Sequence, residues 1–295
     1  MDIGIVGAGK WGVALKFILS KHNKVCITSR TPRDIDDFVP MEQIVECDYL
    51  VMCISSQNIG DWMTNNFKFK NQKMLVASKG IDYKRGKFLN QVFDDFLPRD
   101  NIAFLSGPSF ATEVIKNYPT ALVVSSLNKN LAKEYASVFP NFIKTYISDD
   151  VIGTEIASSY KNVIAIAGGI CDGLSLGNNA RASLLSRSLI EMYRFGKFFG
   201  GNVETFLGLS GAGDLFLTAT SGVSRNYRVG FNLAKGRKLS NILDDIGEVA
   251  EGILTSSAIN KIATKYDIYT PIASEVELIL HGKNPIDSID DLLKK

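Results

Sequence analysis

The sequence begins with a short apolar strand that leads directly into a glycine-rich turn. Residues 2–12 read DIGIVGAGKWG, and residues 13–19 continue as a predicted helix. A G-x-G-x-x-G turn between a strand and a helix is typical of dinucleotide-binding domains. Gly7 would make the tight turn, Gly9 would let the backbone approach a pyrophosphate, and Gly12 would let the helix pack on the strand. We therefore expect a dinucleotide here, with its pyrophosphate over the N–H groups at the helix N-terminus.

The following segments continue the alternation of strands and helices. Strands are predicted over 24–29, 48–54, 73–78, 101–106 and 121–126, and helices over 58–66, 86–96 and 131–138. Continuously apolar strands that alternate with helices favour a parallel sheet covered on both faces. The sequence thus predicts an α/β domain over residues 1–149, with a Rossmann-type doubly wound parallel sheet.

From residue 150 onward the apolar residues recur every three or four positions, which indicates helices. They are predicted over 154–174, 179–199, 203–207, 225–235, 242–246, 254–266 and 271–281. Residues 163–170 are apolar nearly all round, so they should form a buried central helix. We expect an all-α domain over 150–295. Ligands of open α/β sheets bind beyond the carboxyl ends of the strands, so the substrate is expected in the cleft between the domains.

Composition excludes several classes of protein. The chain has 295 residues, is 45% apolar and 22% charged, and carries a net charge of +2. Neither half is strongly basic, so a nucleic acid or an anionic membrane is not expected as a partner. No apolar run approaches the ~20 residues that span a bilayer, and the core strand at the N-terminus argues against a signal peptide. The four cysteines (Cys26, Cys47, Cys53 and Cys171) lack metal-ligand spacing. We expect reduced, buried thiols, no metal and a cytoplasmic location.

The end of the second strand bears on which nucleotide binds. A strict NAD site has an acidic residue about 20 positions after the glycines, where it holds the ribose 2′-OH. Here that position falls in TSRTPR, residues 28–33, which contains no acidic residue. The first acidic residue after this segment is Asp34. Arg30 and Arg33 are well placed for a 2′-phosphate, although both could instead be solvated loop residues. The pattern favours NADP(H) and leaves NAD(H) open.

A carbonyl reduction also needs a proton donor. The chain has two histidines, and both lie where surface or packing roles are expected. A lysine is the next choice, because burial or a neighbouring cation lowers its pKa. Lys79 directly follows the fourth predicted strand, and Lys161 lies on the helix that enters the apolar run. Lys161 could also be a helix-end residue whose stem covers apolar surface.

Two polar segments complete the candidate site. GPSFA, residues 107–111, follows the fifth strand and offers backbone donors and the Ser109 hydroxyl, or is simply a proline turn. GLSGAGD, residues 208–214, precedes the Ser224–Arg225–Asn226 segment. The planar fork of Arg225 suits a phosphate or carboxylate. Asp214 could orient a lysine ammonium or a substrate hydroxyl, or could cap a helix.

Taken together, these segments resemble the bacterial NAD(P)-dependent glycerol-3-phosphate dehydrogenases of phospholipid synthesis. The resemblance runs nearly end to end. It is carried by GKWG at 9–12, SKGI at 78–81, GPSFA at 107–111, YKNVIAIAGGI at 160–170, GNNAR at 177–181, GAGDL at 211–215, SRN at 224–226 and VAEG at 249–252. Any one of these motifs is modest support, whereas their occurrence in this order is highly specific.

The resemblance implies a role for each candidate residue. Lys161 would exchange the proton with the glycerol hydroxyl oxygen, and Lys79 and Asp214 would complete the catalytic set. The substrate, a phosphorylated triose, would contact Lys79, Gly107, Ser109, Asp214, Ser224, Arg225 and Asn226. The cofactor, NADP(H) or NAD(H), would contact Gly7, Gly9, Lys10, Trp11, Gly12, Arg30, Lys79, Ala111, Arg225, Val249 and Glu251. The helical half would be like the C-terminal domain of 6-phosphogluconate dehydrogenase, and a homodimer is compatible with the family.

One stretch departs from the family pattern. The segment from Arg30 to Asp48 is much shorter than usual, and the aromatic cofactor contact normally found there has no obvious counterpart; Phe38 and Tyr49 are poor candidates.

Two alternatives to this family remain at this point. A 3-hydroxyacid or 6-phosphogluconate dehydrogenase would show a different glycine pattern around the lysine and no GD…SRN block. A non-catalytic dinucleotide sensor would be favoured by the absence of Lys161 or Asp214, and both are present.

Overall fold

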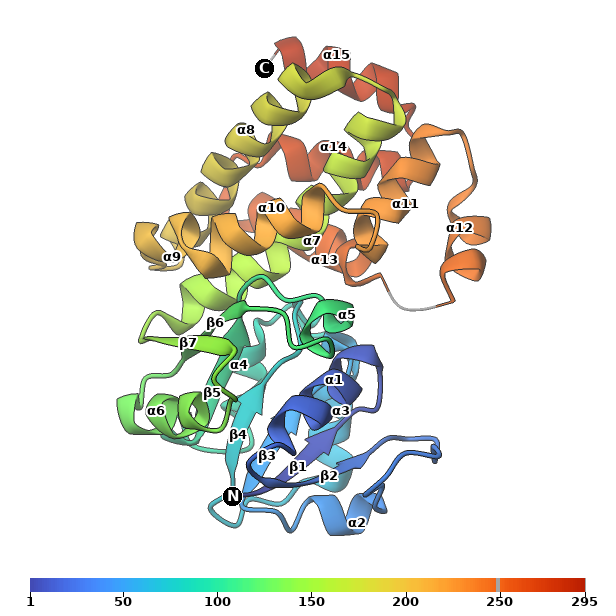
Figure 1. Cartoon of the computed structure of the whole chain (residues 1–295). Coiled ribbons are helices and arrows are strands. Elements are labelled where there is room, and N and C mark those ends of the chain that lie inside the picture. The colour runs from blue at the N-terminus through green and yellow to red at the C-terminus, as the bar shows by residue number, and fades with distance from the viewer. Residues whose placement is uncertain (248–249, 295) are drawn as a thin grey trace. The chain divides into compact units, whose positions relative to one another are not determined.

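The computed structural model describes residues 1–247 and 250–294. The chain forms two compact units, coloured blue to green and green to red in Figure 1. The first unit comprises Met1–Lys79 and Phe88–Val151, and the second comprises Gly80–Lys87 and the chain from Ile152 onward. The short Gly80–Lys87 segment therefore groups with the helical unit although it lies within the predicted α/β region.

The first unit is built on a seven-stranded sheet of order β2-β1-β3-β4-β5-β6-β7. The strands are β1 (Asp2–Val6), β2 (Lys24–Thr28), β3 (Tyr49–Met52), β4 (Lys73–Val76), β5 (Ile102–Ser106), β6 (Thr120–Ser125) and β7 (Ile143–Ser148). The helices are α1 (Lys10–Leu19), α2 (Met41–Ile44), α3 (Ser56–Asn66), α4 (Leu89–Phe93), η1 (Arg99–Asn101), α5 (Ala111–Val114) and α6 (Lys129–Ser137). The predicted Rossmann-type fold is confirmed.

Alternate side chains of the strands feed two apolar cores, one on each face of this sheet. Ile3 and Ile5 of β1 join a cluster with Leu15 of α1 and Leu131 of α6. Val6 belongs instead to the cluster that contains Ile59 of α3 and Val92 of α4. Because both faces are covered, the strands are continuously apolar, as a doubly wound sheet requires.

The structure corrects the predicted sheet at its far side. β6 runs antiparallel to β5, so the sheet is mostly rather than wholly parallel. β7 was not predicted, because it is a sheet-edge strand in which only Ile143 is buried and its sequence lacks an apolar run. The helix predicted over 86–96 is shorter, and the short helices α2 and α5 escaped prediction because four residues carry too little periodicity.

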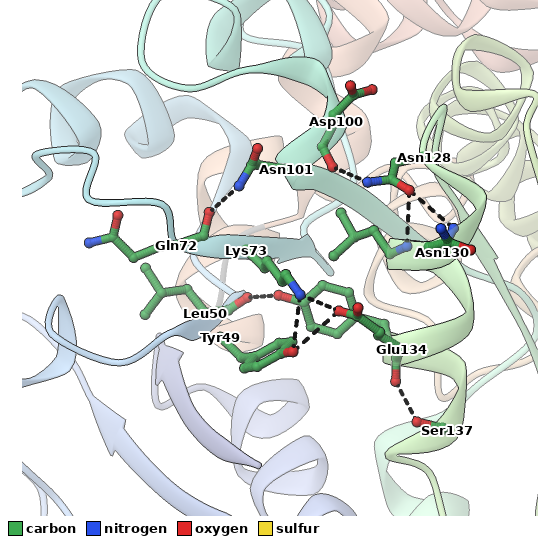
Figure 2. A network of polar contacts seen from close by, with 12 residues as sticks. Tyr49, Leu50, Gln72, Lys73, Asp100, Asn101, Asn128, Asn130, Glu134 and Ser137 are labelled. Carbon is green, nitrogen blue, oxygen red and sulfur yellow. Dashed lines mark hydrogen bonds and ion pairs between the residues drawn. The ribbon is translucent and has the colours of Figure 1, made fainter.

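Polar side chains tie the amino-terminal ends of β3 and β4 to α6 (Figure 2). The Lys73 ammonium donates to Glu134 Oε2 at 2.6 Å and to the Tyr49 hydroxyl at 3.2 Å. The buried Tyr135 hydroxyl donates to the carbonyl oxygen of Leu50 at 3.1 Å. Asn128 caps α6 through its side-chain oxygen. This network therefore stabilises the amino-terminal ends of the parallel strands, which lie opposite to their carboxyl ends.

From Ile152 onward, the described residues of the second unit form helices and no strand, as predicted. Its helices are α7 (Val151–Gly173), α8 (Gly177–Phe198), α9 (Val203–Leu207), the π-helix η2 (Leu209–Gly213), α10 (Asp214–Ala219), α11 (Arg225–Ala234), α12 (Leu239–Ile246), α13 (Glu251–Tyr266), α14 (Pro271–Leu280) and α15 (Pro285–Lys294). α7 is the expected buried central helix. The glycine-rich stretch, for which no helix range was predicted, contains η2 and α10, and α15 adds a final helix that was not predicted.

Small residues let α7 and α11 pack closely. A Cβ at Gly169 would lie 2.0 Å from the carbonyl oxygen of Tyr227, and a Cβ at Gly230 would lie 1.9 Å from that of Ile166. Any larger residue at either position would separate the two backbones. The N-terminus of α11, which carries Arg225 and Asn226, is therefore held at a fixed place relative to α7, which carries Lys161.

A buried carboxylate joins three helices of the same unit. Glu191 of α8 is 2% exposed and accepts a hydrogen bond from the Tyr160 hydroxyl of α7 at 2.8 Å. It also accepts the backbone N–H groups of Ile272 at 2.8 Å and Ala273 at 2.9 Å, in the first turn of α14. Glu191 thus satisfies donors that a helix cannot satisfy by itself.

No helix in the described residues combines the length and the apolar character that crossing a membrane demands.

Candidate active site

The turn after β1 has the geometry that a dinucleotide requires. Gly7 has φ +116°, and a Cβ there would lie 2.8 Å from the Cys53 carbonyl oxygen, so only glycine fits. A Cβ at Gly12 would lie 1.9 Å from the Gly7 carbonyl oxygen, which explains why α1 can pack so closely on the turn. Around Gly9, by contrast, a Cβ would meet no atom of the chain within 4 Å.

This open space lies at the N-terminus of α1. Gly9 is the N-cap of that ten-residue helix and supplies no side-chain cap. The first-turn N–H groups of a helix point outward and carry partial positive charge, so they suit the pyrophosphate of a dinucleotide. The residues present therefore fit the expected cofactor. Lys10, which is exposed, and Trp11, which is half-buried, occupy the first turn of α1.

The segment after β2 presents two arginines. Arg30 lies two residues beyond the end of β2 and Arg33 lies five residues beyond it, and both are exposed. Because β1 and β2 are parallel neighbours, Arg30 follows the same edge of the sheet as the glycine turn. Tyr49 lies at the opposite edge, at the start of β3, and Phe38 pairs with Ile27 in an isolated bridge.

Two further loops lie along the carboxyl edge of this sheet. Lys79, half-buried, comes three residues after β4. Gly107 directly follows β5 with φ +108°, and a Cβ there would lie 2.9 Å from the Ala121 carbonyl oxygen. Ser109 Oγ donates to the Gly107 carbonyl at 3.2 Å, and Ala111 begins α5. The parallel pairing of β1, β3, β4 and β5 puts these loops and the glycine turn at one edge.

The second unit contains a buried cluster centred on Lys161. This side chain of α7 is 6% exposed, and its Nζ donates to Asp214 Oδ1 at 2.5 Å and to Thr218 Oγ1 at 2.9 Å. Thr218 Oγ1 in turn donates to Asp214 Oδ1 at 3.2 Å. Lys161 is therefore not a helix-end residue that reaches solvent. Asp214, the first residue of α10, is turned to the lysine and supplies no cap to that helix.

Thr218 received no role from the sequence, although it completes this cluster. It lies four residues after Asp214, so the two side chains share one face of α10. This four-residue spacing could have indicated Thr218 as a partner of Asp214, but only if the segment were already known to be helical. Among the buried hydroxyls of the described residues that have no hydrogen-bond partner, Ser158 Oγ and Thr255 Oγ1 were also unassigned. Ser158 lies one turn before Lys161 on the same side of α7.

The start of α11 combines structural and candidate binding residues. Ser224 is its N-cap and accepts from the Tyr227 N–H at 3.3 Å through Oγ. Asn226 is buried, and its Oδ1 accepts the Gly252 N–H at 3.0 Å, which ties α11 to α13. Arg225, the first residue of α11, is exposed. Glu251 begins α13 and is half-buried, while Val249 lies outside the described residues.

Chemically, the second unit offers a buried amine held by a carboxylate and a hydroxyl. Such a group can give a proton to a carbonyl oxygen or take one from a hydroxyl.

Within residues 1–247 and 250–294, no cluster of three or more His, Cys, Asp or Glu side chains could hold a metal ion. The thiols are free, but only Cys171 is buried; the expectation of burial was wrong for Cys26, Cys47 and Cys53, which are half-buried.

Two family models match the chain. The model for the C-terminus of NAD-dependent glycerol-3-phosphate dehydrogenase matches residues 150–290, and the model for its N-terminus matches residues 39–132. Two curated proteins named glycerol-3-phosphate dehydrogenase [NAD(P)+] are similar over their whole length. The one from a Nitratiruptor species is 59% identical over 295 residues, covering 100% of this chain and 99% of that protein. The one from Sulfurimonas denitrificans is 55% identical over 291 residues, covering 99% and 98%.

Solved structures agree with these matches. The crystal structure of glycerol-3-phosphate dehydrogenase from Coxiella burnetii has a TM-score of 0.91 and 32% identity, covering 100% of this chain and 99% of that one. D-mandelate dehydrogenase, with a TM-score of 0.63 and 14% identity, covers 98% and 99% and shows that the fold is shared more widely.

Proposed function

The chain belongs to the NAD-dependent glycerol-3-phosphate dehydrogenase family, and from this premise we propose how its residues carry out the reaction. The reaction is the reversible, NAD(P)H-dependent reduction of dihydroxyacetone phosphate to sn-glycerol 3-phosphate, which supplies glycerophospholipid synthesis. The observation that carries the proposal is the buried contact of Lys161 with Asp214 and Thr218, because this is the proton-transfer group that such a reduction needs.

Residues 1–149 would bind the cofactor. The reduced nicotinamide supplies a hydride to C2 of the substrate when it is bound. Gly9 leaves open space beside the N-terminus of α1 for the pyrophosphate, while Gly7 allows the tight turn and Gly12 the close packing of α1. Lys10 and Trp11 would line this space. Arg30 would contact the adenosine ribose and, in NADPH, its 2′-phosphate. Its place after β2 and the lack of an acidic residue between the end of β2 and Asp34 support a preference for NADPH.

Residues 150–295 would bind the substrate and move the proton. Lys161 Nζ would donate a proton to the C2 oxygen as that oxygen gains negative charge. Asp214 and Thr218 orient the lysine, and the Asp214 carboxylate balances its positive charge within the buried site. In the oxidative direction Lys161 would accept the proton from the glycerol hydroxyl, so one group serves both directions.

The remaining candidates would position the substrate. Arg225 can form paired hydrogen bonds with a phosphate, and Asn226 and Ser224 lie beside it at the start of α11. Lys79, Gly107 and Ser109 would add contacts from the carboxyl edge of the sheet. Lys79, Ala111, Arg225, Val249 and Glu251 would also meet the cofactor. Holding the phosphate fixes the carbonyl for reaction and so lowers the entropic part of the barrier.

Three finer expectations belong to the same proposal: the absence of a metal requirement, a cytoplasmic location and a homodimer. Exposed apolar side chains on α8 to α10, among them Ile190, Leu207 and Phe216, support self-association. Activity that survives a chelator tests the first expectation, cell fractionation tests the second, and light scattering of the purified protein tests the third.

The decisive experiment is a spectrophotometric assay of reduced nicotinamide with dihydroxyacetone phosphate as substrate. NADH and NADPH are compared side by side, and a 3-hydroxyacid and 6-phosphogluconate with the oxidised cofactors serve as controls. We expect consumption of both reduced cofactors with dihydroxyacetone phosphate and none without it. Turnover of either control substrate alone would favour the related dehydrogenase classes, and cofactor binding without any turnover would favour a sensor.

A further inference from the structure

Two cysteines that the reaction does not use lie in contact in the first unit. Cys26 is in the middle of β2, and Cys47 follows α2 shortly before β3. Their Sγ atoms are 3.6 Å apart, and both residues are half-buried, so solvent can reach them. A disulfide bond is about 2.05 Å long, so the two sulfurs need to approach by only about 1.5 Å, which side-chain rotation can supply.

The fold builds this contact from several elements. The segment after β2 turns back and pairs with it, since Ile27 donates its N–H to the Asp37 carbonyl at 3.1 Å and accepts the Val39 N–H at 2.9 Å. The helical turn of α2 then returns the chain to β1. There, a Cβ at Gly4 would lie 3.1 Å from Cys47 Sγ, so the absence of a side chain at this position of β1 leaves room for this sulfur.

The electrostatics of the pair suit thiol chemistry. The hydrogen bond from Cys47 lowers the pKa of Cys26, and the nearby Lys24 ammonium adds to this effect, while burial and Asp2 oppose it. The same hydrogen bond and burial raise the pKa of Cys47. Cys26 is therefore the sulfur that ionises first, and Cys47 is the thiol beside it that stabilises the thiolate. A nucleophilic and a resolving thiol in contact is the arrangement of a reversible disulfide.

We propose that Cys26 and Cys47 form a modification site that is oxidised reversibly to an intrachain disulfide by a low-molecular-weight disulfide such as oxidised glutathione. Cys26 attacks one glutathione sulfur and releases the first glutathione thiolate. Cys47 then attacks the sulfur of Cys26 and releases the second. Two protein thiols are oxidised, one glutathione disulfide is reduced, and the two thiol protons pass to the two glutathione molecules.

The disulfide closes residues 26–47 into a covalent ring. This ring contains Arg30 and Arg33, so oxidation restrains the segment that carries them. On the proposed function, which assigns Arg30 to the cofactor, the restrained segment loses less conformational freedom when NADPH binds. We therefore expect oxidation to lower the KM for NADPH without changing the KM for dihydroxyacetone phosphate. The formation of the disulfide itself does not depend on that assignment.

The test treats the whole protein with oxidised glutathione, then alkylates it and maps its peptides by mass spectrometry. We expect the loss of two of the four free thiols, a peptide that joins Cys26 to Cys47, and full reversal by dithiothreitol. Amide hydrogen exchange should slow within residues 29–46 after oxidation. The Cys53→Ser/Cys171→Ser double variant, which keeps only the proposed pair, should behave in the same way.

Cys26→Ser and Cys47→Ser are the matched variants in which neither the linked peptide nor the slower exchange should appear. Alkylated Cys26 and Cys47 after treatment of the native protein, or links that form only between chains, would overturn the proposal. A linked peptide with an unchanged or higher KM for NADPH would overturn its regulatory part. A reduced protein that turns over no dihydroxyacetone phosphate would instead contradict the proposed function and leave the thiol measurements intact.

Discussion

Lys161 shows how a single residue acquires its role from its neighbours. A lysine in a buried position needs partners, and Asp214 and Thr218 accept its hydrogen bonds. The sequence placed Lys161 one turn before an apolar run, which suits a catalytic lysine and a helix-end lysine equally well. Only the contact with a residue 53 positions away distinguishes the two.

Replacement of Lys161 by alanine should remove proton transfer and leave the cofactor residues of the first unit intact. We expect kcat to fall by about 10²–10⁴-fold, with a nearly unchanged Kd for NADPH. Steady-state kinetics and fluorescence titration of NADPH measure the two quantities. Thr218→Val, which removes only one of the two hydrogen bonds of Lys161, serves as a comparison, and its kcat should fall less. An equal loss of turnover and NADPH binding in Lys161→Ala would show that Lys161 is structural.

Replacement of Arg30 by glutamate should change the choice of cofactor. The new carboxylate repels a 2′-phosphate but can accept a hydrogen bond from a ribose 2′-OH. The KM for NADPH should therefore rise more than the KM for NADH. Arg33→Glu, three residues further along the same segment, is the matched control. If the ratio of the two KM values does not change in Arg30→Glu, the assignment of Arg30 to the 2′-phosphate is wrong.

At the scale of elements, the strands and long helices follow from local patterns, whereas short or edge elements do not. β1 and α7 are recognisable because their apolar residues are continuous or periodic. β7 escaped prediction because it is half-exposed at the sheet edge, and α10 because glycines precede it. The brace formed by Glu191 was equally hidden, since its partners on α7 and α14 lie 31, 81 and 82 positions away.

Glu191 should make the stability of the protein depend on pH. Burial raises its pKa above the ordinary value of 4.5, although hydrogen bonds from Ile272, Ala273 and Tyr160 oppose this shift. The folded state then holds the proton more tightly than the unfolded state does. The resulting stabilisation is complete below pH 4.5 and is lost as the pH rises through the raised pKa.

Urea unfolding of the native protein and of Glu191→Gln across this range measures the effect. The native protein should lose stability relative to the variant as the pH rises, and a constant difference would contradict the raised pKa. Glu191→Ala should cost on the order of 3 kcal/mol at low pH, because three buried donors lose their acceptor, and this cost should shrink as the pH rises. Tyr160→Phe, which removes one of these donors, should cost about 1 kcal/mol.

At the scale of the whole molecule, the two units divide the proposed work. The glycine turn, Arg30, Lys79 and Gly107 belong to the sheet unit, and Lys161, Asp214 and Arg225 belong to the helical unit. NADPH, whose proposed pyrophosphate site lies in the first unit, should bind the folded protein and not the unfolded chain. Its binding should therefore stabilise the folded protein.

NADPH at about 100 times its Kd should raise the free energy of unfolding by about 2.7 kcal/mol. Differential scanning fluorimetry at several NADPH concentrations measures this shift, and amide exchange should show the strongest protection at residues 7–12. Gly9→Val, whose side chain would enter the open space beside α1, should abolish the shift while the protein still folds. A full shift in that variant would place the dinucleotide elsewhere.

The sequence by itself determined the order of the long helices and of the first six strands, the dinucleotide turn and the family resemblance, because these depend on residues close together along the chain. Only the tertiary structure decided that β6 runs antiparallel to β5, that Lys161 meets Asp214 and Thr218, and that Cys26 meets Cys47. The reason is physical. Periodicity and turn chemistry act over a few residues, whereas a side chain's partner depends on how distant elements pack, and that packing is settled by the whole core.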